Sequence, residues 1–328
     1  MTTTKQDRDV LAAWGGRVEE ASERIRDIIV RTEVQESTRV APDFDGKVWL
    51  KLEHRQRTGS FKLRGAANRI ASLTPEEARA GVTTSSTGNH GLGVAHAGRD
   101  VGVPAEVFVS RLVSEDRLER MRALGATIRT VEGSVLDAEL AARAEADSTG
   151  KVYISPYNDP HVVAGQGTIA LELREDLDRL DAVFVAVGGG GLIGGIGAYL
   201  KARAPGVEVV GCWPENAPAL HACLEAGRIV DVAEEPTLSE STAGGVEEGS
   251  ITFDLARRVI DRSVLVTEDE ILAAMRLLEA REGWVVEGAA GVALAAFLKS
   301  WEHGPGGHVA IVLCGGNVSP AVRSRMAG

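Results

Sequence analysis

Short runs rich in β-branched residues alternate with amphipathic helical stretches along the whole chain of 328 residues. The runs expected to form strands cover residues 82–85, 105–110, 127–131, 152–155, 182–187, 207–213, 263–267 and 308–313. Helical patterns lie between them at residues 115–124, 135–146, 166–177 and 268–281. Strands that alternate with helices in this way form parallel sheets covered by helices on both faces. The sequence therefore predicts an α/β protein, long enough for one large or two ordinary domains.

A lysine lies at one of the expected strand-to-helix junctions. Lys62 follows a β-like run at residues 47–52 and a turn formed by Thr58 and Gly59. Small residues at such a junction let a ligand approach the backbone closely. Because most lysines are solvated surface charges, the meaning of Lys62 depends on the loops that follow it.

Four consecutive glycines, residues 188–191, separate the expected strand at 182–187 from a helical pattern that begins at Leu192. Such a loop turns backbone N–H groups toward an anion at the positive end of the helix. The pattern is not a P-loop, and the next strand lacks the terminal acid of a dinucleotide site. We expect a phosphate here, although a tight turn with close packing would also use glycine.

A polar loop follows the expected strand at residues 82–85, and it contains Ser86, Thr87, Asn89 and His90. Hydroxyl and amide groups at the start of a helix are suited to a carboxylate. For Ser86 or Thr87 alone, an ordinary helix cap is the simpler interpretation. The whole loop favours carboxylate binding.

Lys62, the polar loop, the glycine loop and a late Cys-Gly-Gly-Asn segment at residues 314–317 occur in a characteristic order. In that order they resemble the fold type II pyridoxal-phosphate enzymes. The nearest resemblance is to the threonine/serine dehydratase and serine racemase family, and it extends from about residue 33 to residue 319.

The resemblance implies a fold of the tryptophan synthase beta type, with two parallel-sheet α/β domains and the cofactor in the cleft between them. The large domain would be discontinuous and comprise residues 1–71 and 156–328. The small domain would be residues 72–155, inserted between those segments. Composition alone does not place these borders.

The resemblance also implies a role for each motif residue. Lys62 would carry pyridoxal 5′-phosphate and act as the catalytic base, and Thr87 occupies the position of a second acid–base serine in serine racemase. The other cofactor contacts implied are Phe61, Asn89, Gly188, Gly189, Gly190, Gly191, Leu192 and Cys314. The substrate contacts implied are Ser86, Thr87, Gly88, Asn89, His90 and Gly244.

Cys314 and Glu287 bear on the chemistry in different ways. The family places serine or cysteine beside the pyridine nitrogen, which leaves the ring neutral and favours elimination over a long-lived carbanion. On sequence alone, Cys314 is equally well explained as a small core residue. Glu287 matches a family glutamate near the site, but an acid at the start of a helix is an equal alternative.

The chain departs from the family pattern at two residues on its metal side and at two on its substrate side. Trp213 and Ala219 stand where metal-dependent members carry carboxylates, and hard cations need oxygen ligands, so no metal is expected there. Gly244 stands where relatives carry an aspartate, and Asp137 falls where serine racemase uses an arginine. These changes give a weaker resemblance to hydroxyectoine-utilization dehydratases and favour a substrate larger than serine.

The expected activity is β-elimination from a β-hydroxy amino acid, which releases a 2-oxo acid and ammonia. One alternative is a hydroxyectoine-utilization dehydratase that acts on a larger hydroxy amino acid. A second is a racemase of serine or hydroxyaspartate, since Thr87 retains a hydroxyl. A third, from another functional class, is a catalytically silent sensor with this fold, against which the intact Lys62 argues.

Composition restricts the partners. With 36 basic and 47 acidic residues, the chain is too acidic for nucleic acid or an anionic membrane as a main partner. Residues 1–7 lack the apolar stretch of a secretion signal. Three cysteines without metal spacing favour reduced thiols. We expect a cytoplasmic enzyme with a small amino acid substrate and, by resemblance, a homodimer.

Overall fold

Two separate sheets organise the computed structural model, which describes residues 5–111, 115–301 and 307–327. The larger sheet has the strand order β1-β2-β10-β7-β8-β9. Its strands are β1 (Val34–Glu36), β2 (Lys47–Lys51), β7 (Ala182–Ala186), β8 (Glu208–Pro214), β9 (Arg262–Val266) and β10 (His308–Val312). Neighbouring strands are parallel except for β1, which pairs with β2 in the antiparallel sense at the edge.

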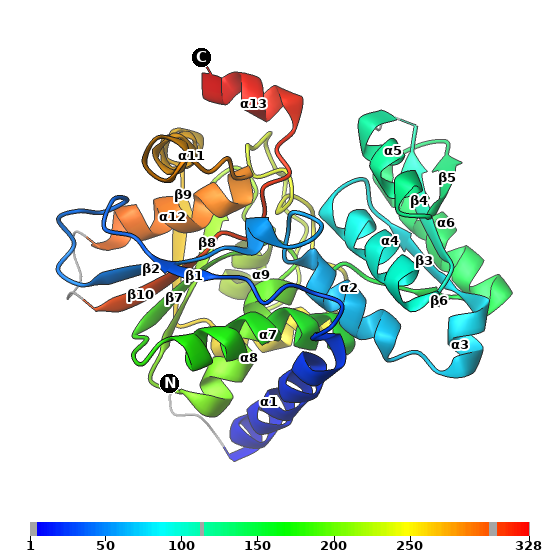
Figure 1. Ribbon diagram of the computed structural model, residues 1–328, viewed down its shortest axis with the longest axis horizontal. Coiled ribbons are helices and arrows are strands. Elements are labelled where there is room, and N and C mark those ends of the chain that lie inside the picture. Colours follow the sequence, from blue (N-terminus) through cyan, green and yellow to red (C-terminus); the bar gives the residue numbers. More distant parts are fainter. Residues whose placement is uncertain (1–4, 112–114, 302–306, 328) are drawn as a thin grey trace.

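The smaller sheet is entirely parallel and has the order β5-β4-β3-β6. Its strands are β3 (Val82–Ser85), β4 (Ala105–Ser110), β5 (Thr127–Val131) and β6 (Val152–Tyr153). All four strands fall inside the expected small domain, residues 72–155, whose borders stay a prediction. In Figure 1 this sheet and its helices form the lobe on the right.

Helices cover both sheets, as parallel strands require. Around the larger sheet lie α1 (Lys5–Ile25), α7 (Pro160–Asp176), α8 (Gly191–Arg203), α9 (Ala219–Ala226), α10 (Ile251–Val259), α11 (Glu268–Glu282), α12 (Gly288–Trp301) and α13 (Pro320–Ala327). The smaller lobe carries α3 (Pro75–Ala80), α4 (Asn89–Val101), α5 (Glu115–Ala123) and α6 (Val135–Thr149). Helix α2 (Lys62–Ala71) lies between the lobes, where it packs on both α4 and α7 (Figure 1).

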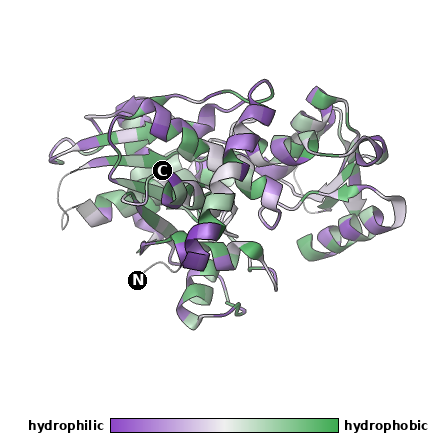
Figure 2. Ribbon diagram, turned by 90° about the horizontal axis from the view of Figure 1, so that it is seen from below, coloured by the Kyte–Doolittle hydropathy of each residue, from purple (hydrophilic) through white to green (hydrophobic). Residues whose placement is uncertain are grey.

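The core follows the apolar runs of the sequence. Every residue of β7 is buried, because α12 packs on one face of this sheet and α7 and α8 lie on the other (Figure 1). Figure 2 shows apolar stretches along the strands and the inner helices of the larger lobe. Strands apolar on both faces thus occupy the centre of a three-layer arrangement.

The eight strands and four helices expected from the sequence are present, which confirms the α/β prediction. The largest shift is in α7, which begins at Pro160 rather than at residue 166. Asp159 caps this helix by accepting hydrogen bonds from the N–H groups of His161 and Val162, and proline suits the first helical position. The three-residue edge strand β1 was not expected.

Two expectations concern the chain's surroundings. Among the described residues, no helix is both long enough and apolar enough to span a membrane. The first four residues of the N-terminal segment, which were expected to lack a secretion signal, lie outside the described residues.

Candidate active site

The end of β10 holds the loop that leads to Lys62. The N–H of Phe61 donates to the carbonyl of Cys314 at 3.0 Å, and the N–H of Gly316 donates to the carbonyl of Gly59 at 2.9 Å. Gly59 has φ 78°, a left-handed conformation that glycine adopts without strain. Helix α2 then begins at Lys62, so the lysine lies in the first helical turn beside the carboxyl end of a parallel strand.

The amine of Lys62 has few polar neighbours. Its Nζ donates a hydrogen bond to the carbonyl of Pro156 at 2.9 Å and lies 5.3 Å from the centre of the Phe61 ring. Burial lowers the pKa of Lys62 to about 8, against the opposing effect of the Glu287 carboxylate. A lysine with such a pKa is partly deprotonated near neutral pH, as a nucleophile or a base must be.

A cavity of about 410 Å³ opens beside this amine. Both lobes line it: the polar loop and α5 belong to the smaller, and the segments at residues 238–241, 287–288 and 317–322 to the larger. Lining residues used below are Lys62, Ser86, Thr87, Gly88, Asn89, His90, Arg117, Arg120, Glu240, Ser241, Glu287 and Asn317. The predicted base and the whole predicted carboxylate loop therefore share one cavity.

Asn89 and Glu287 link the two lobes through side-chain hydrogen bonds. Asn89 Nδ2 donates to Glu287 Oε2 at 2.8 Å, and Ser241 Oγ donates to the other carboxylate oxygen at 3.0 Å. Asn317 Nδ2 in turn donates to Asn89 Oδ1 at 2.7 Å. Burial raises the pKa of Glu287, and these hydrogen bonds only partly offset that effect. Glu287 directly precedes α12, but its carboxylate faces the cavity.

His90 is neutral in this environment. Burial lowers its pKa to about 3, and the positive charge of Lys62 acts in the same direction. The ring Nε2 lies 3.0 Å from the carbonyl of Ile154, to which the neutral ring donates its proton. The His90 side chain therefore ties α4 to the end of the smaller sheet and carries no positive charge.

The glycine loop leads directly into α8. Gly190 is its cap residue with φ 85°, and no side chain caps the helix, so its first N–H groups remain for an anion. A β-carbon at Gly189 would lie 2.6 Å from the Tyr157 ring, and one at Gly191 would lie 3.1 Å from Tyr157. Only glycines fit this cradle. Tyr157 follows Pro156, the partner of Lys62, so the loop lies beside the lysine.

The donor set thus fits pyridoxal phosphate: an amine for the aldehyde and a helix start for the phosphate. The glycines, Leu192, Phe61 and Cys314 do not themselves line the 410 Å³ cavity. Cys314 is buried next to the Lys62 loop, and burial raises the pKa of its thiol well above the ordinary value. Its position agrees with both sequence interpretations, a core residue and a neighbour of the cofactor ring.

Gly244 is placed differently from the other predicted substrate contacts. It is exposed, outside the cavity lining, and its N–H donates to Glu234 Oε2 at 2.7 Å. Its φ of 122° would strain any side chain introduced there. Ser241, three residues earlier in the same loop, reaches the cavity instead. A substrate contact at Gly244 stays a prediction.

Several residues that line the cavity belong to no sequence motif from which they could have been predicted. Arg117 and Arg120 lie three residues apart on α5 and therefore on one helix face. Glu240 and Ser241 lie in a loop without regular secondary structure. Asn317 could have been found, because it ends the Cys-Gly-Gly-Asn segment, but that segment was interpreted through its cysteine.

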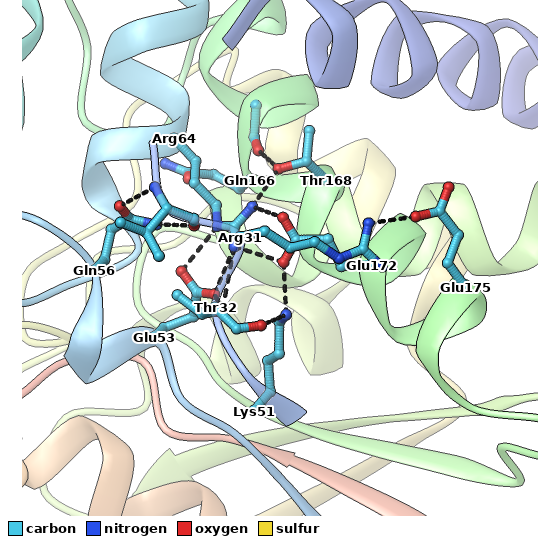
Figure 3. Close-up of polar contacts among 12 residues, drawn as sticks. Arg31, Thr32, Lys51, Glu53, Gln56, Arg64, Gln166, Thr168, Glu172 and Glu175 are labelled. Carbon is cyan, nitrogen blue, oxygen red and sulfur yellow. Dashed lines mark hydrogen bonds and ion pairs between the residues drawn. The ribbon is translucent and has the colours of Figure 1, made fainter. Parts of the chain in front are cut away.

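A second group of polar residues surrounds Arg64 (Figure 3). Because side chains two residues apart on a helix point in nearly opposite directions, Arg64 lies on the face of α2 away from Lys62, behind that lysine. We call Lys51, Glu53, Arg64 and Glu172 the buried charge cluster. Arg64 binds both carboxylates, with distances of 2.8 Å to Glu53 and 2.7 Å to Glu172, and Lys51 Nζ lies 2.6 Å from Glu172. The Lys51, Glu53 and Arg64 side chains are fully buried. Since Arg64 is two residues from Lys62, the cluster fixes the first turn of α2 against α7.

At the two positions where metal-dependent members of the family carry carboxylates, this chain has Trp213 and Ala219. Trp213 is fully buried, and its ring centre lies 5.3 Å from that of His221. Across the described part of the chain, no three histidine, cysteine, aspartate or glutamate side chains gather as a metal site would require. Independence of metal stays a prediction that removal of metal tests.

Comparison with known proteins gives a consistent family. The model of the pyridoxal-phosphate dependent enzyme family matches residues 25–315. L-threonine ammonia-lyase from Thermotoga maritima is 41% identical over 303 residues, 92% of this chain and 75% of that protein. Phenylserine dehydratase from Ralstonia pickettii is 33% identical over 100% of this chain and 98% of its own length.

The solved structure of maize serine racemase superposes with a TM-score of 0.87 at 29% identity, over 95% of this chain and 96% of that one. Each of these matches extends over at least 92% of this chain and therefore includes both lobes. The glycine loop at the start of α8, the half-buried lysine beside it and these similarities agree. The chain belongs to the pyridoxal-phosphate-dependent enzyme family, in its fold type II, threonine/serine dehydratase-like branch.

Proposed function

We propose that this enzyme removes the hydroxyl group and the amino group from a β-hydroxy amino acid larger than serine, and releases a 2-oxo acid and ammonia. The observation that carries the proposal is the half-buried Lys62, whose amine lies at the wall of the shared cavity and has its pKa lowered to about 8. The similarity to an L-threonine ammonia-lyase and a phenylserine dehydratase supports the same reaction class.

Pyridoxal phosphate, when bound, supplies an aldehyde for the amine and a ring that withdraws electrons from the α-carbon. In this proposal Lys62 holds the aldehyde, the N–H groups of the glycine loop bind the phosphate, and Asn89 contacts the ring hydroxyl. Cys314, which would face the ring nitrogen, has a raised thiol pKa because it is buried, so it would add no negative charge there. A ring that stays neutral favours departure of the β-hydroxyl over a persistent carbanion.

The substrate is positioned by the start of α4. The residues from Ser86 to His90 bind its α-carboxylate, and the helix N-terminus favours the negative charge. Lys62 Nζ, released when the substrate amine takes its place on the cofactor, would then accept the α-proton, since burial keeps part of the amine unprotonated. The β-hydroxyl would leave with a proton as water, and Lys62 would return to the cofactor and release the enamine product. The enamine tautomerises and takes up water to give the 2-oxo acid and ammonia.

Racemisation is the second candidate, and one observation favours it. Thr87, whose side chain carries a hydroxyl, lines the cavity, and the match to the maize serine racemase structure extends over 95% of the chain. The branched threonine side chain has restricted rotamers, which limits its use as a second acid–base group. Chiral analysis of unreacted substrate separates this candidate from elimination.

The test combines a substrate screen with one substitution. Purified enzyme with added pyridoxal phosphate is assayed for 2-oxo acid release from L-threonine, L-serine, phenylserine and hydroxyaspartate. Lys62→Ala should reduce release to background and abolish the visible absorbance of the lysine-bound cofactor, whereas the exposed-lysine control Lys47→Ala should change neither. Full activity in Lys62→Ala would end the proposal.

Assembly and location belong to the same proposal. The family resemblance implies a homodimer in the cytoplasm, and light scattering of the purified protein together with cell fractionation tests both. Activity should also persist after treatment with EDTA, because Trp213 and Ala219 replace the expected carboxylate ligands.

A further inference from the structure

Two arginines project into the candidate active site from the smaller lobe, and neither has a role in the reaction described above. Arg117 and Arg120 line the cavity that holds Lys62 and the polar loop. They lie on the same face of α5, opposite the segments of the larger lobe that close the cavity. Their guanidinium groups are the natural partners of a carboxylate.

Among the residues that the structure describes, no carboxylate binds either arginine strongly. Arg117 lies 3.4 Å from Glu240, and 37% and 48% of the two side chains are exposed to solvent. A long, exposed ion pair of this kind is weak and easily replaced. Arg120 donates to the neutral amide oxygen of Asn317 at 3.0 Å. An incoming carboxylate would therefore be a better partner for both guanidinium groups.

Arg120 is connected by hydrogen bonds to the loop that would hold the reacting end of a substrate. Its partner Asn317 also donates to Asn89, at 2.7 Å, so Arg120 is two hydrogen bonds away from the loop proposed to bind the α-carboxylate. An amino acid bound by that loop would direct its β-substituent into the remaining cavity. The arginines thus lie within the reach of a group attached beyond the β-carbon.

The charged residues that line the cavity favour a substrate whose side chain is negatively charged. Besides Lys62, its charged lining residues are Arg117, Arg120, Glu240 and Glu287. Glu287 is occupied by hydrogen bonds from Asn89 and Ser241, and Glu240 accepts hydrogen bonds from Ser319 and Arg117. A substrate side chain near α5 consequently meets a surplus of positive charge.

We infer that Arg117 and Arg120 select a dicarboxylic β-hydroxy amino acid by binding the carboxylate of its side chain. The inference rests on the proposed function, because it names the substrate class for the same site. L-Threonine and L-serine lack the second carboxylate and leave both arginines without an ionic partner from the substrate.

The test measures binding separately from turnover. L-Aspartate and L-alanine lack a β-hydroxyl, so they bind without elimination, and they differ by the side-chain carboxylate. Titration calorimetry on the cofactor-loaded enzyme should give L-aspartate at least about tenfold tighter binding, the value of one charge-assisted hydrogen bond. Arg117→Gln and Arg120→Gln should each reduce this ratio severalfold, and the double variant should bring it close to one.

Arg122→Gln is the matched control, since Arg122 is on the same helix but outside the cavity lining and pairs with Glu115. This variant should keep the wild-type ratio. Equal binding of the two amino acids to the wild-type enzyme would overturn the inference. A preference for L-aspartate that survives in the double variant would overturn the assignment to these arginines.

Turnover then distinguishes this inference from the proposed function. Wild-type kcat/KM for hydroxyaspartate should exceed that for L-threonine, and the double variant should lose at least about tenfold on hydroxyaspartate while L-threonine changes less than about threefold. If L-aspartate binds selectively but no hydroxy amino acid yields an oxo acid, the proposed function fails and the recognition stands. If L-threonine is the best substrate, elimination stands and the dicarboxylate assignment fails.

Discussion

The two sides of Lys62 use the same kinds of charged residue in opposite ways. Behind the lysine, the buried charge cluster places two cations and two carboxylates out of contact with water, and each is paired (Figure 3). In front of it, Arg117 and Arg120 are partly exposed, with one weak ionic partner and one neutral partner. The charged groups of the buried charge cluster are all paired within the protein, whereas Arg117 and Arg120 remain available to a ligand.

The difference has an energetic basis. A buried ion pair gains little over an apolar pair, because desolvation offsets the attraction, but removal of one partner strands a buried charge. An exposed pair contributes about 0–1 kcal/mol and is screened by salt. We therefore expect changes behind Lys62 to act on stability and changes in front of it to act on binding and turnover.

The largest effect is expected at Arg64. Arg64→Met leaves Glu53 and Glu172 without their shared cation and should lower the free energy of unfolding by about 3–5 kcal/mol. Urea denaturation followed by circular dichroism measures it. Arg31→Met is the control, because Arg31 pairs with Glu175 and Asp176 at the exposed edge of the same region and should cost less than about 1 kcal/mol. If the two variants lost the same amount of unfolding free energy, the distinction between buried and exposed ion pairs would be refuted.

On the cavity side, Gly190→Asp should act mainly on the cofactor. A carboxylate about 4 Å from a bound phosphate costs about 4 kcal/mol, or about a thousandfold in the dissociation constant. Because Gly190 has φ 85°, Gly190→Ala carries the same backbone strain without the charge and serves as the control. Fluorescence titration with pyridoxal phosphate should separate the two variants, and equal dissociation constants would place the phosphate elsewhere.

The next prediction concerns the pH dependence of activity, which reflects the protonation of the Lys62 amine. Lys62 is a free amine only after the substrate amine has displaced it from the cofactor, so its lowered pKa of about 8 bears on kcat, which should fall as the pH decreases below 8 by about tenfold per pH unit. Glu287 raises this pKa, so Glu287→Gln should lower it further and move the fall in activity to lower pH. A pH profile unchanged by Glu287→Gln would show that Lys62 is not the titrating group.

The same pKa predicts the pH dependence of stability in the cofactor-free protein. The unfolded state holds its proton up to about 10.5, whereas the folded state loses it at about 8. The penalty for the buried ammonium is therefore fully present below pH 8 and is relieved between pH 8 and 10.5. Relative to Lys62→Met, which lacks the titrating amine, the wild-type protein should gain unfolding free energy through that range.

The fold was largely predictable from the sequence, since period and composition are local properties. The run at residues 182–187 is apolar without interruption, which is typical of a strand buried on both faces, and β7 is such a strand. The start of α7 was missed although Asp159 and Pro160 are an ordinary helix start signal. The edge strand β1 was missed because three residues, Val34 to Glu36, show no measurable period.

The site was predictable only where a motif surrounds the residue. Lys62, Asn89 and the glycine loop belong to such motifs, and the structure brings the first two into one cavity. Arg117 and Arg120 reach the same cavity because the two lobes pack together, and no local pattern records that contact. The buried charge cluster was missed for the same reason, since Glu53 and Glu172 are 119 positions apart in the chain but share Arg64.

The smallest effect on the free energy of unfolding is expected at Arg117, which lines the cavity. Arg117→Gln removes only the 3.4 Å, partly exposed pair with Glu240, so its unfolding free energy should change by less than about 1 kcal/mol. Added salt should remove even this difference, because exposed pairs are screened. Urea denaturation of Arg117→Gln, measured at low and high salt beside Arg64→Met, tests the statement directly. A loss as large as that of Arg64→Met would mean that Arg117 holds the lobes together, and its proposed availability to a substrate carboxylate would then have no basis.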